Sequence, residues 1–212
     1  PCCFRVKTLF ETLEEAQKYK FLGPLPIENH IKNGEGFLEV LTRLSLNVNA
    51  PIRLVDIGSG GGIPALVIAE KYPHWSFLLV ERKAKRASFL SWAVENTVFG
   101  ENIEIFLGEA EIAARDREFE GKADFVTARS FAPPPKTAEC GCRFLKKGGY
   151  MVVSEPPKAE KRWPTAELSL LGLETREVKK PNYGTFQVLE LNHIPDQIYP
   201  RSPKTINKKA LW

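Results

Sequence analysis

The stretch from Arg53 to Lys71, RLVDIGSGGGIPALVIAEK, constrains the fold of this chain more than any other. It opens with Leu54 to Ile57, a short and mostly apolar run that suits a buried strand but is too short for a helix. The glycine-rich segment 58–62 can continue neither element, because glycine permits positive φ and is costly to order. Pro64 then presets a first helical turn ahead of good helix formers. The pattern predicts a strand, a glycine turn and a helix, with bare amides facing a ligand.

Asp56 indicates which ligand that is. Its carboxylate lies at the end of the predicted strand, just before the glycines. A negative charge there repels a pyrophosphate and attracts an ammonium or a sulfonium group. The sequence therefore favours S-adenosylmethionine (SAM) over a dinucleotide.

Two other interpretations of the loop stay open. Gly60, Gly62 and Ala65 fit the spacing G-x-G-x-x-A, so a dinucleotide site is possible on spacing alone. A glycine turn that only connects two core elements is the other. A dinucleotide site would make the protein an oxidoreductase, which has the least support among the functions considered.

Strands and helices are expected to alternate from Arg53 onward, which predicts a mostly parallel sheet with helices on both faces. The last two strands, joined by Pro181 to Gly184, are expected to form a hairpin, so the final strand should be antiparallel. With the glycine loop, this predicts a Rossmann-like α/β fold of the class I SAM-dependent methyltransferase type. The expected strands are 54–57, 75–81, 103–107, 123–128, 150–154, 173–179 and 185–192, and the expected helices after the glycine loop are 84–98, 135–145 and 165–171.

The first fifty residues differ from the rest. Segments 4–21 and 27–46 carry apolar residues at helical spacing and are separated by Gly23-Pro24-Leu25-Pro26. We expect residues 1–50 to form a helical N-terminal cap and residues 51–212 to form the Rossmann-like domain with a basic C-terminal tail. A chain of 212 residues with 43% hydrophobic content can bury one full core.

Composition excludes several classes of protein. No apolar run approaches the ~18 residues of a membrane span, and no signal-type leader is present. The chain begins with Pro1, so we expect that its natural start is missing. The four cysteines, Cys2-Cys3 and Cys140-Gly141-Cys142, lack zinc-site spacing and indicate free thiols in a reducing cytoplasm, with no metal. The net charge of +4 permits a nucleic-acid partner.

Polar residues at the ends of the other strands are the remaining site candidates, because ligands of open α/β sheets lie there. Glu81 lies 19 positions after Gly62, a spacing at which a carboxylate reaches ribose hydroxyls; helix capping is its alternative. Ala110 and Glu111 could border an adenine, or Glu111 could be an exposed helix-start acid. Arg129 could hold a phosphate or lie against a base, or form a surface ion pair.

Two basic stretches could contact phosphates. The tail from Tyr199 to Lys209 contains no acid, and cations also open the helix expected after Glu81. A solvated terminus is the alternative. The proposed RNA-binding residues are Lys85, Arg86, Arg201, Lys204, Lys208 and Lys209.

The expected chemistry needs no catalytic base. A sulfonium methyl donor is already activated, so positioning matters more than proton transfer. Guanine N7 has a free lone pair and no proton to lose. Methylation of an exocyclic amine would instead call for an Asn/Asp-Pro-Pro-aromatic turn after the fourth strand, where residues 129–134 read Arg-Ser-Phe-Ala-Pro-Pro.

These residues together resemble the RsmG (GidB) family of bacterial methyltransferases, which make 7-methylguanosine in 16S ribosomal RNA. The resemblance implies that Arg129 contacts both the cofactor and the target guanine, and that the family's substrate, the small ribosomal subunit, is the partner. The residues that it implies contact SAM are Gly58, Ile63, Ala110, Glu111 and Arg129. The segments that carry the resemblance are 56–64, Lys85-Arg86 with Phe89-Leu90, Ala110-Glu111, Thr127-Ala128-Arg129 and Tyr199-Pro200-Arg201.

The sequence departs from the family pattern at two places. Ser154-Glu155 stands where the family usually has Lys-Gly, and Asn33-Gly34-Glu35 stands where it prefers Asp-Ser. Because the charge of Glu155 would repel phosphate, a non-catalytic SAM- or RNA-binding module is the main alternative. A methyltransferase of another RNA or of a small molecule is the next. We expect a cytoplasmic monomer without a membrane partner.

Overall fold

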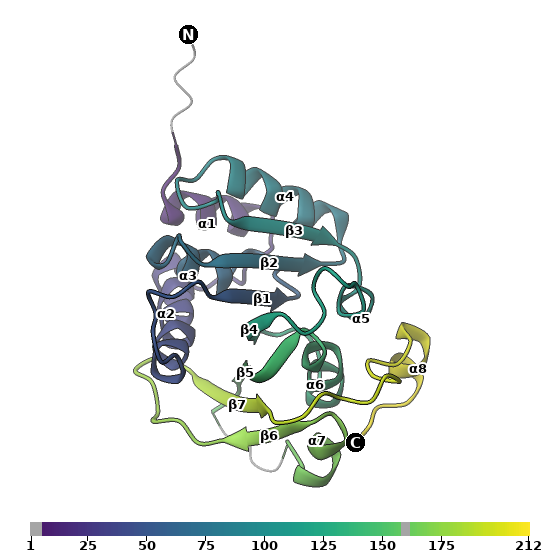
Figure 1. Cartoon of the computed structure of the whole chain (residues 1–212). Coiled ribbons are helices and arrows are strands. Elements are labelled where there is room, and N and C mark those ends of the chain that lie inside the picture. The colour runs from purple at the N-terminus through teal and green to yellow at the C-terminus, as the bar shows by residue number, and fades with distance from the viewer. Residues whose placement is uncertain (1–5, 158–161) are drawn as a thin grey trace.

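The computed structural model describes residues 6–157 and 162–212 and shows one seven-stranded sheet in the order β3-β2-β1-β4-β5-β7-β6 (Figure 1). The strands are β1 (Arg53–Ile57), β2 (Ser76–Glu81), β3 (Ile103–Leu107), β4 (Ala123–Ala128), β5 (Leu145–Glu155), β6 (Leu173–Arg176) and β7 (Thr185–Leu191). The helices are α1 (Leu9–Lys18), α2 (Ile27–Leu44), α3 (Ala65–Lys71), α4 (Ala84–Glu95), α5 (Ala110–Ala113), α6 (Pro134–Cys142), α7 (Thr165–Leu170) and α8 (Pro203–Lys208).

The sheet has the predicted directions. β1 is parallel to β2 and β4, and the pairs β2–β3 and β4–β5 are also parallel. β7 lies between β5 and β6 and is antiparallel to both, so the mostly parallel sheet with an antiparallel last strand is confirmed. Chain order reverses between β1 and β4, which places a crevice at the carboxyl ends of these two strands.

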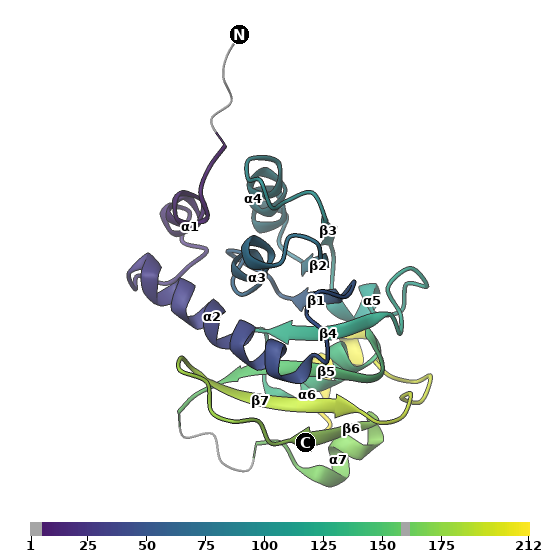
Figure 2. The ribbon, with the colours of Figure 1, turned by 60° about the vertical axis from the view of Figure 1, so that its left-hand side comes forward.

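The helices cover the two faces of the sheet separately (Figure 2). Helices α1 to α4 contribute to one hydrophobic cluster, with Leu13, Phe37 and Leu66 fully buried in it. Helices α5 to α8 contribute to the other, which contains Phe144 and Leu168. Because α1 and α2 share their core with α3 and α4, they pack on the sheet itself; the division at residue 50 stays a prediction.

The structure differs from the expected elements mainly at two helices that were not predicted and at the bounds of β5 and β6. Helices α5 and α8 were not predicted: four residues are too few to show a helical period, and the lysines of α8 suggested a free tail. β5 begins at Leu145, ahead of Gly148, and its register with β4 shifts between Ala123 and Phe125. β6 ends at Arg176, short of the expected residue 179.

The state of the cysteines and the presence of membrane spans or metal sites can be checked in the described part of the chain. Cys140 and Cys142 are buried and free, as predicted, and burial raises the pKa of the Cys142 thiol to about 12. Cys2 and Cys3 lie outside the described residues. Within residues 6–157 and 162–212, no helix is long and apolar enough to cross a membrane, and no group of three metal-ligating side chains could hold a metal ion.

Candidate cofactor and substrate site

The glycine loop after β1 is held by the carboxylate that ends β2. The backbone N–H of Gly60 donates to Glu81 Oε2 at 3.0 Å, and that of Lys83 donates to Oε1 at 2.8 Å. Gly58 has φ +72°, and a Cβ there would lie 2.6 Å from the ring of Phe131. A side chain at position 58 would therefore strain the backbone and displace Phe131.

Asp56 keeps one carboxylate oxygen without a partner. The residue is 1% exposed; Oδ1 accepts the Thr127 hydroxyl at 2.7 Å, whereas Oδ2 is buried and makes no hydrogen bond. Burial raises the pKa of this carboxyl to about 6, and Thr127, Ser59 and Arg129 oppose the rise. Because a buried unpaired carboxylate oxygen is costly, it marks a place where a cation can bind.

Arg129, just after β4, is positioned by a buried histidine. His30 Nε2 lies 3.1 Å from the carbonyl of Gly23, so this nitrogen donates, and Nδ1 accepts from Arg129 Nη2 at 3.1 Å. Both nitrogens of the imidazole are therefore occupied, so neither is free to act as a base. Arg129 Nη1 is buried without a partner, and burial lowers the pKa of the guanidinium.

Asp56 and Arg129 carry opposite charges but do not form a direct ion pair. They interact electrostatically, yet no ion pair within 4.0 Å joins them, and each keeps an unpartnered atom. A ligand with an ammonium and a carboxylate could satisfy both, the ammonium on Asp56 and the carboxylate on Arg129. The amino-acid end of SAM has this pair of charges, so these residues fit the predicted cofactor.

A cavity of about 380 Å³ lies at the carboxyl ends of the parallel strands. Four residues of the predicted site line it: Gly58, Glu81, Arg86 and Ala110. Its wall also includes Ser130 and Phe131 after β4, together with Lys136 and Asn207, whose side chains are joined by a 2.9 Å hydrogen bond. Asn207 belongs to α8 and was missed by the sequence interpretation, because nothing near it in the chain links it to the glycine loop.

Two predicted cofactor residues have side chains that face the cores. Ile63 is buried in the cluster on the α1–α4 side of the sheet. Glu111 is 2% exposed and lies 3.6 Å from Lys136 Nζ and 3.6 Å from Cys140 Sγ. Neither is among the residues that line the cavity, and their contact with the cofactor stays a prediction.

A second cavity of about 510 Å³ adjoins the first and shares Ser130, Phe131 and Ala132 with it. Ser130 has φ 54°, a left-handed conformation that is uncommon for serine and typical of functional turns. Three residues that line this cavity carry buried atoms without a partner: Asn33 Oδ1, Arg129 Nη1 and Trp163 Nε1. The residues that line this cavity therefore include one with an unpartnered acceptor and two with an unpartnered donor.

The acid that replaces the family's Lys-Gly is neutralised. Glu155 is buried and accepts from Arg162 Nη1 at 2.6 Å. Its charge is thus already paired inside the protein. Glu155 therefore presents no unpaired charge to a phosphate, and such a charge was the reason to consider a non-catalytic module.

The residues predicted to bind RNA fall into two groups. Lys85, Lys204, Lys208 and Lys209 are exposed, and Arg86 is half-buried at the cofactor cavity. Arg201, in contrast, donates from Nε and Nη2 to both carboxylate oxygens of the buried Glu139, at 2.8 and 2.7 Å. Arg201 therefore anchors the C-terminal segment, and its contact with RNA stays a prediction.

Comparisons with solved structures show the class of fold. A SAM-dependent methyltransferase from Aquifex aeolicus superimposes with a TM-score of 0.56 at 15% identity, over 84% of this chain and 98% of that one. The antibiotic-resistance methyltransferase Kmr gives a TM-score of 0.51 at 17% identity, over 71% and 91%. The chain thus has the fold of the class I SAM-dependent methyltransferases.

The family follows from sequence. Residues 27–184 match the model of the GidB family, described as rRNA small subunit methyltransferase G. Ribosomal RNA small subunit methyltransferase G of Streptococcus pyogenes, serotypes M3 and M49, is 31% identical over 170 residues, which cover 77% of this chain and 71% of each relative. The chain belongs to the rRNA small subunit methyltransferase G family, and the predicted resemblance is confirmed.

Proposed function

We propose that this protein transfers a methyl group from SAM to N7 of a guanine in 16S ribosomal RNA, within the small ribosomal subunit. Its membership of the methyltransferase G family supports the reaction class and the RNA substrate. A monomer in the cytoplasm, where such a substrate is found, remains our expectation.

Asp56, Glu81 and Arg129 have the central binding roles in this proposal. Asp56 Oδ2 attracts the ammonium group, Arg129 Nη1 holds the carboxylate, and Glu81, already bonded to the loop, has further lone pairs for ribose hydroxyls. Room for the cofactor is left by three small residues, Gly58, Gly60 and Ala110. The buried side chains of Ile63 and Glu111 pack behind this site. Bound SAM supplies a methyl group on a positively charged sulfur.

The second cavity suits the target base. Guanine presents acceptors at O6 and N7 and donors at N1 and N2, so it can pair with both kinds of unpartnered atom found there. Asn33 Oδ1 can accept from the donor edge, and Trp163 Nε1 can donate to O6. The attacked N7 has no proton to lose, which agrees with His30 being fully occupied by its two partners.

The observation that carries the proposal is the pair of unpartnered atoms, Asp56 Oδ2 and Arg129 Nη1; Arg129 lines the second cavity. The test is incubation with methyl-tritiated SAM and small subunits that lack the family's modification. We expect label in 7-methylguanosine after digestion to nucleosides. RNA containing 7-deazaguanosine, which lacks N7, should accept no label; label in that RNA would contradict N7 as the target.

Variants separate the two cavities. Asn33→Leu should lower kcat/KM about 10- to 100-fold because it leaves a buried base donor unpaired, with SAM affinity unchanged. Asp56→Asn should abolish SAM binding. An Asn33→Leu enzyme with wild-type kcat/KM would show that the target base lies elsewhere.

The exposed lysines complete the proposal. Lys85, Lys204, Lys208 and Lys209, with Arg86 beside the cavity, are proposed to bind RNA phosphates. Replacing any one of these cations with alanine should reduce the salt dependence of RNA binding, because fewer counterions are released when the RNA binds.

A further inference from the structure

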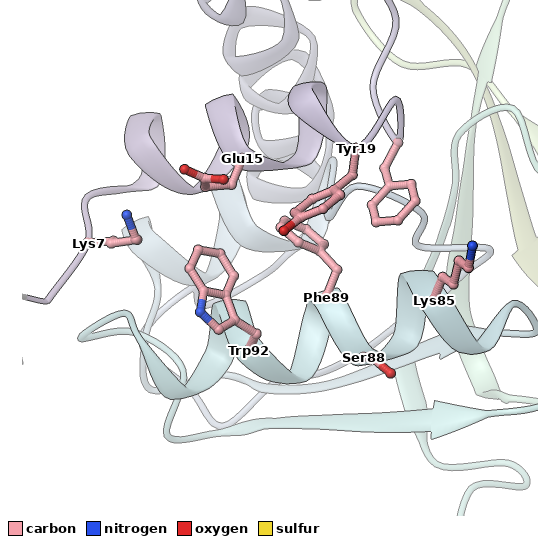
Figure 3. Close-up of a pocket in the computed structure, with 8 residues that line it drawn as sticks. Lys7, Glu15, Tyr19, Lys85, Ser88, Phe89 and Trp92 are labelled. Carbon is pink, nitrogen blue, oxygen red and sulfur yellow. The ribbon is translucent and has the colours of Figure 1, made fainter.

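An aromatic groove lies outside both cavities, between α1 and α4 (Figure 3). Its volume is about 720 Å³, within the ~300–1,000 Å³ range of small-ligand pockets. We call it the α1–α4 groove. It is lined by Lys7, Glu15, Tyr19, Phe21, Lys85, Ser88, Phe89 and Trp92.

The floor of the groove is a row of rings centred on Phe89. The ring centroid of Phe89 lies 5.7 Å from that of Trp92, 5.6 Å from that of Phe21 and 6.5 Å from that of Tyr19. Tyr19 is 63% exposed, and the Trp92 ring rises from α4 toward Lys7 and Glu15 (Figure 3). The groove is therefore lined by a continuous set of aromatic rings, with Tyr19 exposed at its edge.

Cations surround this row. Lys7 Nζ lies 5.6 Å from the centre of the Trp92 ring, and the Arg86 guanidinium lies 5.8 Å from that of Phe21. The acid in the groove, Glu15, forms an ion pair with Lys18 at 2.8 Å, which lowers the pKa of its carboxyl. With Lys85 also at the rim, the charge of the groove complements a polyanion.

The turn after α1 holds two of the rings in place. Phe21 N–H donates to the Ala16 carbonyl and Lys20 N–H to that of Gln17, both at 2.9 Å, which is the hydrogen-bond pattern of a Schellman turn. Lys20 has φ 58° at the position where glycine is preferred. A lysine at this strained position places another exposed cation next to the groove.

We propose that the α1–α4 groove binds an unpaired nucleobase of the RNA substrate, with its flanking phosphates on Lys7 and Lys85. Sequence-tolerant RNA binding combines aromatic platforms with cations in this way. The proposal rests on the proposed function, which makes RNA the substrate. Arg86 lines the cofactor cavity and also faces Phe21, so an RNA strand in the groove lies next to the cofactor site.

The test is binding of a labelled single-stranded RNA oligonucleotide, and of undermodified small subunits, to the whole protein. Tyr19→Leu and Trp92→Leu keep apolar side chains but remove the rings; each should weaken RNA binding about 5- to 100-fold. Lys85→Ala should reduce the salt slope of log K by about 0.7. SAM affinity, measured by calorimetry, should stay at the wild-type value in all three.

Two matched variants serve as controls. Phe10→Leu changes an exposed ring of α1 that is not in the groove, and Lys147→Ala removes an exposed cation near the start of β5. Both should bind RNA like the wild type.

The outcomes distinguish this proposal from the function. If the wild type methylates RNA and the Tyr19 and Trp92 variants bind RNA equally well, the groove is not an RNA site, although the function stands. If they lose self-association in sedimentation while RNA binding is unchanged, the groove contacts a second copy and the proposal is wrong. A wild type that binds no RNA overturns both.

Discussion

The buried carboxylates of Glu139 and Asp56 are both associated with an arginine, but in different ways. Glu139, on α6, is fully buried and receives three hydrogen bonds from Arg201: from the backbone N–H, Nε and Nη2. Asp56, on β1, receives one side-chain bond, from Thr127, and is not paired with Arg129. We call Glu139 and Arg201, whose charges are bonded to each other, the closed pair. We call Asp56 and Arg129, each of which keeps an unpartnered atom, the open pair.

The difference distinguishes a pair that is satisfied within the protein from the pair that we propose to bind SAM. A buried ion pair is tolerated when hydrogen bonds satisfy its charges, as at Glu139 and Arg201, where the carboxylate raises the pKa of the guanidinium. At Asp56 the same cost is left uncompensated in the free protein, and burial raises the carboxyl pKa to about 6. The closed pair anchors the C-terminal segment, whereas the open pair keeps Asp56 Oδ2 and Arg129 Nη1 without a partner.

Breaking the closed pair should have the largest effect. Arg201→Ala leaves Glu139 buried and unpaired, so the free energy of unfolding should fall by ~3–5 kcal/mol in denaturant titrations. The fraction that remains folded should still bind SAM, since Arg201 does not line the cofactor cavity.

A double variant checks the cause. Glu139→Gln combined with Arg201→Met removes both charges and should recover much of the stability that Arg201→Ala removes. Equal instability of the single and double variants would mean that packing, rather than an unpaired charge, accounts for the effect.

Neutralising Asp56, the carboxylate of the open pair, should raise the free energy of unfolding rather than lower it. The Asp56 carboxyl has a pKa of about 6 in the folded protein against an unperturbed 3.8. Between these values the folded state holds a proton that the unfolded chain has released, so stability falls as pH rises from about 4 to 6. Asp56→Asn removes this cost and should raise the free energy of unfolding by up to about 3 kcal/mol at pH 8, with no gain near pH 4.

Asp124→Asn is the matched control. Asp124 accepts from the backbone N–H of Arg53 at 2.8 Å and pairs with Lys146, so its neutralisation should destabilise the protein. Destabilisation by Asp56→Asn as well would show that the two carboxylates are equally structural.

Local patterns predicted the sheet well and the C-terminal segment poorly. The alternating strands and the hairpin near Pro181 are encoded in short-range periodicity, and the structure follows them. Helix α8 was missed although Ser202 caps it and Pro203 opens it, because the run of lysines suggested a free tail. The contact that anchors the segment joins Arg201 to a residue 62 positions away, for which the sequence has no local sign.

Residues of the candidate site could be predicted from the sequence only where the residue type and its place at a strand end suggest a ligand contact. Asp56 before the glycines and Glu81 at the next strand end were selected from the sequence, and their contact with SAM stays a prediction; the bonds from the Gly60 and Lys83 amides to Glu81 were not predicted. Asn33 and Trp163 meet Arg129 at the second cavity through the fold alone. Their unpartnered atoms become visible only when burial is known.

SAM affinity should depend on pH, because the Asp56 carboxyl must be ionised to attract the ammonium group. With a pKa of about 6, only about a tenth of the Asp56 carboxyl is ionised at pH 5 and most of it is ionised at pH 7. SAM affinity, measured by calorimetry, should therefore rise about tenfold over this range. Any SAM binding that remains in Asp56→Asn should show no such rise, and a flat wild-type profile would mean that the bound cation does not face Asp56.

The smallest effect should come from the one side chain that bonds the Asp56 carboxylate. Thr127→Val keeps the shape but removes the 2.7 Å hydrogen bond that favours the ionised form. A bond worth ~1 kcal/mol corresponds to about 0.7 pH unit, so the midpoint of the affinity profile should move up by about that amount. Thr127→Ser keeps the hydroxyl and should leave the midpoint in place. A midpoint that moves equally in both variants would trace the shift to packing around β4, and an unmoved midpoint in Thr127→Val would mean that another group titrates.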